Sequence, residues 1–465
     1  MKTDAANSKL QAYFERAAPF RIIVASFVLI FVPLTALLLV PNYYEWVPYL
    51  VVLEVVGLGV THFFITLAVY LQRDTLRYFN STAKNRLIYF VAPPLILFAL
   101  ALLPAINAEA KYPLFTLYLF RAVRLADFFH VGRQSYGMLQ IWKRQAGDAI
   151  PRWHRSGENA FFVGMAFLQW RTSNQGGYFA NQDPISTMLA LGLLGLFLAL
   201  AVGYLTAMGR GGGTSMLRPL MYLTMQAACA ASAAYQTRLY LTALALHYVE
   251  YHMIMGPRCF YTPLDTRHRV DRANAFLRGH MIFFYALLLL VVVVFEARNH
   301  VTAPLTPTTS FFVHIFDGIF LLHYFIEAFL WRFRIPHYRE TLLPLYMRPW
   351  AEIRREAKES PNPPAAGSRS ALPALGVILI ALLIAHTQGA LASAGAYLTR
   401  TLGKPAYAQN QFEFGLSLAR AGELGRAREH LQVSLEHEPN SPQTRMLLQE
   451  VDEHLRARGG SASPP

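Results

Sequence analysis

Long apolar stretches alternate with short basic stretches along most of this chain. Residues 283–295 and 371–385, for example, contain no charged side chain. A helix that crosses the hydrocarbon core of a bilayer needs roughly 20 mostly apolar residues, and several stretches reach that length. Hydropathy therefore predicts about eleven spanning helices. Their ranges are 20–40, 47–71, 87–105, 113–131, 160–170, 184–208, 219–234, 239–255, 280–297, 311–333 and 371–397. Segment 160–170 is also short enough to be re-entrant, and the two segments beside residue 234 alternatively form one broken helix.

This pattern predicts an all-α fold, namely a polytopic bundle of transmembrane helices followed by a small C-terminal helical-repeat domain. Five regions follow from the changes in composition. They are an N-terminal cytoplasmic segment (1–19), a His-rich transmembrane bundle (20–335), a basic interfacial segment with a linker (336–370), a last transmembrane helix (371–400) and the repeat (401–465).

Composition and charge support a lipid environment. Only 15% of the 465 residues are charged, whereas a soluble domain has about 25%. The net charge of +14 arises from Lys and Arg that gather in the connections on one side of the predicted bundle, as cytoplasmic loops do. The charge therefore indicates topology, and we expect no nucleic-acid partner. The N-terminus is predicted to be cytoplasmic, in a bacterial inner membrane, with the repeat on the opposite side.

Several kinds of chemistry have no support in the sequence. The two cysteines, Cys229 and Cys259, lie in an apolar block and a basic loop, which disfavours a disulfide framework or a cysteine-based zinc site. No Walker A loop, GxGxxG turn, GxSxG elbow or HExxH motif is present. ATP-driven transport and serine hydrolysis are therefore not indicated.

The segment after residue 400 differs in character from the rest. Gly415, Gly422, Ala427, Leu431 and Pro439 occupy the small, aliphatic and proline positions of about one 34-residue unit. Gly415 and Ala427 allow two helices to approach closely, Gly422 lies at the turn, and Pro439 ends the second helix. This segment resembles a tetratricopeptide repeat, and the resemblance implies a surface that recruits a protein partner. A simple helical hairpin is the alternative.

Histidine dominates the ionisable residues of the predicted bundle. Ionisable groups inside a bilayer are costly, so each is a functional candidate. The predicted orientation places His280 and six others in the cytoplasmic half of several helices, and the six can hold iron, manganese or zinc. These candidate metal ligands are His62, His130, His247, His252, His323 and Glu327. Asp127 and Glu250 are predicted to orient the ligands and to act as catalytic groups.

Other interpretations apply to these residues one by one. A single histidine in a membrane helix commonly forms a hydrogen bond between helices. Arg121, Arg124, Asp127 and His130 repeat at three-residue spacing, which fits either a buried ion-pair network or an anionic-substrate site. His314 and Asp317 fall nearer the outer face and form a separate pair of candidates.

In its arrangement of histidines on several helices, the membrane domain resembles polytopic membrane metallo-oxygenases, namely the Brp/Blh-type carotene dioxygenases and the fatty-acid desaturase and hydroxylase group. This resemblance implies a metal-dependent oxidoreductase or oxygenase, with a transition metal, most readily iron, and a lipid, isoprenoid or quinone-like substrate. The alternative is a non-enzymatic membrane scaffold or transporter whose repeat recruits a protein and whose histidines relay protons.

Overall fold

In the computed structural model, all secondary structure within the described residues is helical, which confirms the all-α class. The described residues are 18–39, 58–59, 61–105, 112–147, 152–173, 183–235, 239–261, 264, 267–280, 283–284, 286–287, 290, 307–330, 332, 335–347, 352, 355, 376–377, 380 and 404–460.

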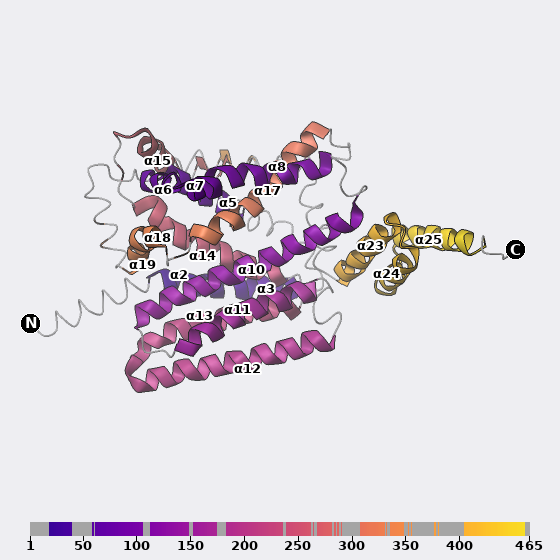
Figure 1. Ribbon diagram of the computed structural model, residues 1–465. Coiled ribbons are helices and arrows are strands. Elements are labelled where there is room, and N and C mark those ends of the chain that lie inside the picture. The colour runs from indigo at the N-terminus through magenta and orange to yellow at the C-terminus, as the bar shows by residue number, and fades with distance from the viewer. Residues whose placement is uncertain are drawn as a thin grey trace, which may run out of the picture.

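Three long helices follow one another and pack as neighbours (Figure 1). They are α10 (Pro113–Ala146), α11 (Arg152–Ser173) and α12 (Pro184–Ala207). Helix α12 begins where the sequence provides a strong start signal, because the Asp183 carboxylate accepts hydrogen bonds from the backbone N–H groups of Ile185 and Ser186, both at 3.0 Å. Arg171 at the end of α11 also donates to Asp183 at 2.7 Å, which ties the two helix ends together.

Five further helices complete the part of the bundle that carries the histidines. Helices α13 (Leu217–Tyr235) and α14 (Tyr240–Tyr261) pack against each other, and α8 (Ala92–Ala105) packs along α17 (Pro307–Leu330). The short helix α5 (Thr61–Leu67) contacts both α14 and α17. The remaining described elements outside the C-terminal region are α2 (Ala18–Ser26), η1 (Phe27–Phe31), α3 (Val32–Leu39), η4 (Ala68–Leu71), α6 (Arg73–Phe79), α7 (Ala83–Arg86), η5 (Leu87–Val91), η6 (Met208–Gly212), η7 (Gly213–Met216), α15 (Arg269–Gly279), α18 (Pro336–Thr341) and α19 (Leu343–Met347).

One predicted helix boundary needs correction, and the alternative of a broken helix beside residue 234 is excluded. The segment predicted at 160–170 is part of the 22-residue helix α11, which is not among the described helices that are apolar enough to cross a membrane. The first turns of α11 contain charged residues, and for that reason they resemble a loop in the sequence. These residues belong to the helix. The pair beside residue 234 is not one broken helix, because α13 and α14 lie against each other.

Two described helices are long and apolar enough to cross a membrane, Ala83–Leu103 and Pro184–Arg210. Only 17% of each is buried against the rest of the protein, and large apolar side chains such as Leu191, Leu194 and Leu198 are more than half exposed. Shorter apolar helices cover Phe20–Ala36, Thr61–Leu71 and Leu321–Leu330. Most residues of the predicted spans at 371–397 and 280–297 lie outside the described residues.

The C-terminal region forms three helices, α23 (Lys404–Arg420), α24 (Leu424–His437) and α25 (Pro442–Gly460). The close approach predicted at Gly415 is present, since a Cβ there would lie 2.6 Å from Leu431 Cγ on α24. Gly422 lies in the turn with a φ of 79°, a left-handed conformation that favours glycine. Helix α24 ends two residues before Pro439.

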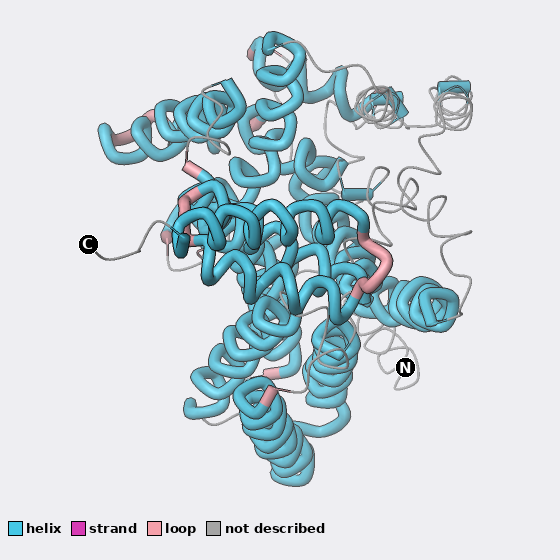
Figure 2. Tube along the Cα trace, turned by 90° about the vertical axis from the view of Figure 1, so that its right-hand side faces the viewer, coloured by secondary structure: helices cyan, strands magenta, loops and turns pink. Residues whose placement is uncertain are grey.

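These three helices lie at one end of the bundle, beside the first half of α10 (Figures 1 and 2). Helix α23 makes the contact, and the Arg121 guanidinium lies over the Phe414 ring at 3.9 Å from its centroid. A cation over an aromatic face is attracted by the ring electrons. The Phe414 ring also stacks on the ring of His430, at a centroid distance of 4.9 Å.

Candidate metal centre

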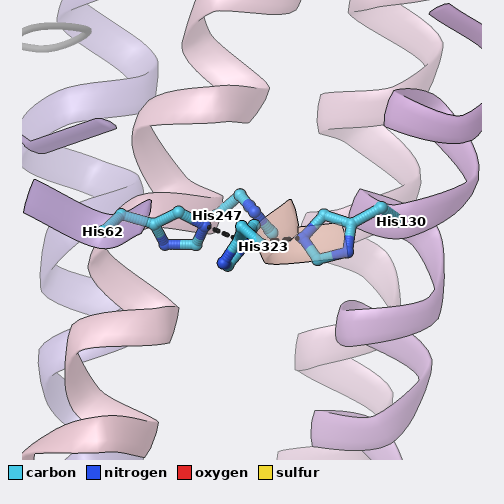
Figure 3. A group of neighbouring side chains, drawn as sticks. All are labelled: His62, His130, His247 and His323. Carbon is cyan, nitrogen blue, oxygen red and sulfur yellow. Dashed lines mark hydrogen bonds between the residues drawn. The ribbon is translucent and has the colours of Figure 1, made fainter. Parts of the chain in front are cut away.

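Four histidines from four helices meet inside the bundle (Figure 3). Helix α5 provides His62, α10 provides His130, α14 provides His247, and α17 provides His323. One ring nitrogen from each lies within 4.8 Å of the corresponding nitrogens of the other three. The side chains are nearly or fully buried, with His130 the most exposed at 9%. This arrangement can hold a metal ion, as the sequence predicted for these four positions.

The nitrogens that face one another are too close for ordinary packing. The Nε2 atom of His323 lies 2.8 Å from Nε2 of His62 and 3.1 Å from Nε2 of His130. A neutral imidazole has one N–H donor and one acceptor nitrogen, so a single Nε2 cannot donate to one neighbour and accept from the other. The lone pair of His323 Nε2 can therefore accept a hydrogen bond from only one of these two neighbours, whereas a shared cation can take a lone pair from each of the three nitrogens.

Glu327 completes one side of the group. Its Oε2 atom lies 3.3 Å from His130 Nε2 and 3.8 Å from His323 Nε2, and the residue is 5% exposed. His323 and Glu327 are four residues apart on α17, so they project from nearly the same face of the helix. A carboxylate beside several imidazoles supplies negative charge for a bound cation.

Aromatic side chains surround the four histidines. The ring of Tyr251 lies 4.2 Å from that of His62, Phe63 lies 5.0 Å from His323, and Tyr324 lies 4.5 Å from His130, measured between centroids. Such walls exclude water and fix the orientation of the imidazoles.

His252 lies beside the group rather than in it. Its Nδ1 is bonded to the Tyr248 carbonyl at 2.7 Å, its Nε2 lies 3.4 Å from Thr61 Oγ1, and its ring centroid is 6.4 Å from that of His62. The structure therefore brings four of the six predicted ligands into one group, with Glu327 beside two of them and His252 at the edge. The side chains of His314 and Asp317 lie outside the described residues.

The two carboxylates predicted to orient the ligands have other partners. Glu250 accepts hydrogen bonds from Tyr222 at 2.9 Å and from Gln226 at 2.5 Å, both on α13. Asp127 accepts from Tyr240 at 2.9 Å and from Tyr324 at 2.5 Å. Asp127 thus reaches the histidines only through Tyr324, and Glu250 faces away from them. Within the described residues, neither carboxylate is in hydrogen-bond contact with a histidine of the group.

Two residues near the histidines were not predicted. Thr66 Oγ1 lies 2.6 Å from His323 Nδ1 and 2.5 Å from the Tyr251 hydroxyl. A sequence signal exists for both, since Thr66 follows His62 by four residues and Tyr251 follows His247 by four. Gln134 follows His130 by the same interval and donates to the His247 carbonyl at 3.1 Å.

A second buried polar cluster lies outside the group, between α10, α11 and α12. Glu158, fully buried, accepts from Lys143 at 2.7 Å, His154 at 2.8 Å, Tyr204 at 2.5 Å and Gln140 at 2.8 Å. Because its carboxylate is so well satisfied, this cluster holds three helices together and offers no open ligand position.

Known proteins provide no independent guide to this centre. No protein-family model, curated protein or solved structure matches the chain. The geometry of the four histidines and Glu327 is therefore the basis for assigning a function to this protein.

Proposed function

We propose that this protein is a membrane-embedded, metal-dependent oxidoreductase of the oxygenase type, with iron bound by His62, His130, His247, His323 and Glu327. The observation that carries the proposal is the meeting of four buried imidazoles from four helices, with their ligand atoms within 4.8 Å. Buried histidines on facing helices are a common way to hold a metal in a bundle.

The donor set fits a transition metal. Adjacent ligands of a six-coordinate ion with bonds of about 2.1 Å lie about 3.0 Å apart, and opposite ligands about 4.2 Å apart. The separations of 2.8, 3.1 and 3.3 Å around His130, His323 and Glu327 are close to the adjacent value. In addition, the Nδ1 atom of His247 is buried without a hydrogen-bond partner within the described residues. Imidazole suits iron, copper and zinc, and the added carboxylate favours iron.

Five protein donors leave one position of a six-coordinate ion for oxygen or substrate. Iron bound there would supply the redox chemistry. The protein would hold the ion, exclude water with Phe63, Tyr251 and Tyr324, and deliver the substrate from the surrounding lipid. The exposed apolar side chains of α12 are compatible with a lipid bilayer as the solvent of this bundle. A lipid, isoprenoid or quinone-like substrate follows from that location.

Metal analysis of the full-length protein in detergent tests the proposal. We expect about one transition-metal ion per chain, and its loss in His247→Ala and His323→Ala. His454→Ala is the matched control, because His454 lies on α25 and is exposed, with its Nδ1 bonded to the Glu450 carbonyl. Full metal retention in both cluster variants would reject the site. With the metal bound, oxygen uptake by vesicles that contain extracted membrane lipids tests the reaction class.

The distances between the imidazoles also support a second function. His62 lies 2.8 Å from one ring nitrogen of His323, and Thr66 Oγ1 lies 2.6 Å from the other, which is the spacing of a proton relay through the ring in a non-enzymatic transporter. A stable, metal-free protein that moves protons across vesicles, and stops doing so in His323→Ala, would favour this alternative.

A further inference from the structure

One hydroxyl group, that of Thr66, connects three of the helices that form the candidate metal centre. Thr66 is fully buried on α5, its Oγ1 lies 2.6 Å from His323 Nδ1 on α17, and the same atom lies 2.5 Å from the Tyr251 hydroxyl on α14. Its Oγ1 also lies 3.3 Å from the carbonyl of His62, one turn earlier on α5.

His323 occupies the middle of the group, and its two nitrogens have separate surroundings. Its Nε2 faces His62 and His130, and its Nδ1 faces Thr66. For Nε2 to present a lone pair to a cation, the ring proton must be on Nδ1, because neutral imidazole carries a single N–H. That proton then needs an acceptor within hydrogen-bond reach, and Thr66 Oγ1 is in that position.

The hydrogen bonds around Thr66 are consistent with this assignment. A hydroxyl oxygen accepts two hydrogen bonds and donates one. Thr66 can accept from His323 Nδ1–H and from the Tyr251 O–H while its own hydrogen points to the His62 carbonyl. Every donor is then used, and the donation to the carbonyl makes the oxygen a better acceptor.

We propose that Thr66, supported by Tyr251, is a positioning residue that holds His323 in the tautomer and orientation in which Nε2 binds the metal. This inference rests on the proposed function, since it requires a metal at the four histidines. Thr66 then orients a metal ligand, which is the role predicted from the sequence for Asp127 and Glu250. Partners of this kind fix the ring orientation and commonly change metal affinity by about 10- to 100-fold when they are lost.

The test compares Thr66→Val, which replaces the hydroxyl with a methyl group of similar size, with Thr66→Ser, which keeps it. Co²⁺ alone is titrated into full-length apo-protein in detergent, and its visible d–d absorption reports both affinity and coordination geometry. We expect Thr66→Val to bind Co²⁺ about 10- to 100-fold more weakly with a shifted spectrum, and Thr66→Ser to remain close to wild type. Thr172→Val is the control, because Thr172 is also fully buried but donates to the Leu168 carbonyl within α11.

The outcomes separate this inference from the proposed function. Absence of Co²⁺ binding by the wild-type protein would reject the proposed function. Wild-type binding together with an unchanged affinity and spectrum in Thr66→Val would overturn only the positioning role. An equal loss in Thr66→Val and Thr172→Val would overturn it too, because a general loss of stability would then be the cause. If Thr66→Val does not fold, Tyr251→Phe replaces it, and an unchanged affinity in that variant would refute the inference.

Discussion

Replacing Gly415 with alanine should destabilise the C-terminal helices through one defined clash. A Cβ at this position would lie 2.6 Å from Leu431 Cγ and 2.8 Å from Leu431 Cδ2, with the Ala427 carbonyl oxygen at 3.2 Å. Carbon atoms in contact normally lie about 3.5–4.0 Å apart, so the overlap is close to 1 Å. Leu431 is fully buried and has little room to move.

The magnitude follows from two opposing effects. Overpacking of this severity costs about 3 kcal/mol, near the upper end of the usual range. Alanine gains up to about 1 kcal/mol over glycine inside a helix. The expected net loss is about 2 kcal/mol, which corresponds to a roughly 30-fold increase in the opening equilibrium of this region.

Amide hydrogen exchange of residues 404–460 in the full-length protein measures this loss. Gly425→Ala is the matched control, since a Cβ at Gly425 in α24 meets nothing within 4 Å, and it should be neutral or slightly stabilising. Leu431→Ala in the Gly415→Ala background removes the clashing atoms, so the two changes should couple by about 3 kcal/mol, the size of the clash. Equal exchange in the Gly415 and Gly425 variants, or strictly additive effects in the double mutant, would refute the reasoning.

Three further predictions concern charge and topology. Glu158→Gln should lower the stability of the bundle by about 3 kcal/mol in thermal unfolding, because it leaves Lys143 without its anionic partner, whereas the exposed Glu436→Gln should have little effect. Burial lowers the pKa of His430, so the unfolded repeat binds a proton more readily than the folded one. The stability of the repeat should therefore decline as the pH falls below about 6.5. His430→Gln should reduce this dependence of stability on pH, measured by hydrogen exchange. A reporter fused after the C-terminus should be active only outside the cytoplasm, and cytoplasmic activity would contradict the predicted orientation.

The sequence predicted part of this structure well because some signals are local. Proline at the start of α10, and Asp183 with Pro184 at the start of α12, mark helix ends wherever the helices pack. The start of α11 was missed for the opposite reason. Arg152, His154 and Glu158 resemble a charged loop until Lys143 and Tyr204 from neighbouring helices are seen to pair with Glu158, and those partners are distant in sequence.

The meeting of the histidines was predictable from depth, but the choice of supporting residues was not. Depth along a helix follows from counting residues, which places His62, His130, His247 and His323 at similar levels. The direction in which a side chain points around the helix axis depends on how each helix is rotated in the bundle. A hydropathy pattern that is apolar on all sides does not reveal that rotation.

The spacing within each helix explains which polar neighbours join the site. Residues four apart on a helix differ in direction by about 40°, whereas residues three apart differ by about 60° in the opposite sense. Glu250, three residues after His247, points to α13, and Tyr251, four residues after it, lies against His62. Asp127, three residues before His130, is likewise held by tyrosines outside the group.

The same interval recurs on all four helices. The pairs are His62 and Thr66, His130 and Gln134, His247 and Tyr251, and His323 and Glu327. In each pair the polar side chain contacts another helix of the site, and through these contacts the four helices are hydrogen-bonded or ion-paired around one point. A single histidine that served only to join two helices would need no such partner. Each histidine is followed at four residues by a polar group that contacts another helix of the site, which favours the proposed orientation of four metal ligands over helix packing alone.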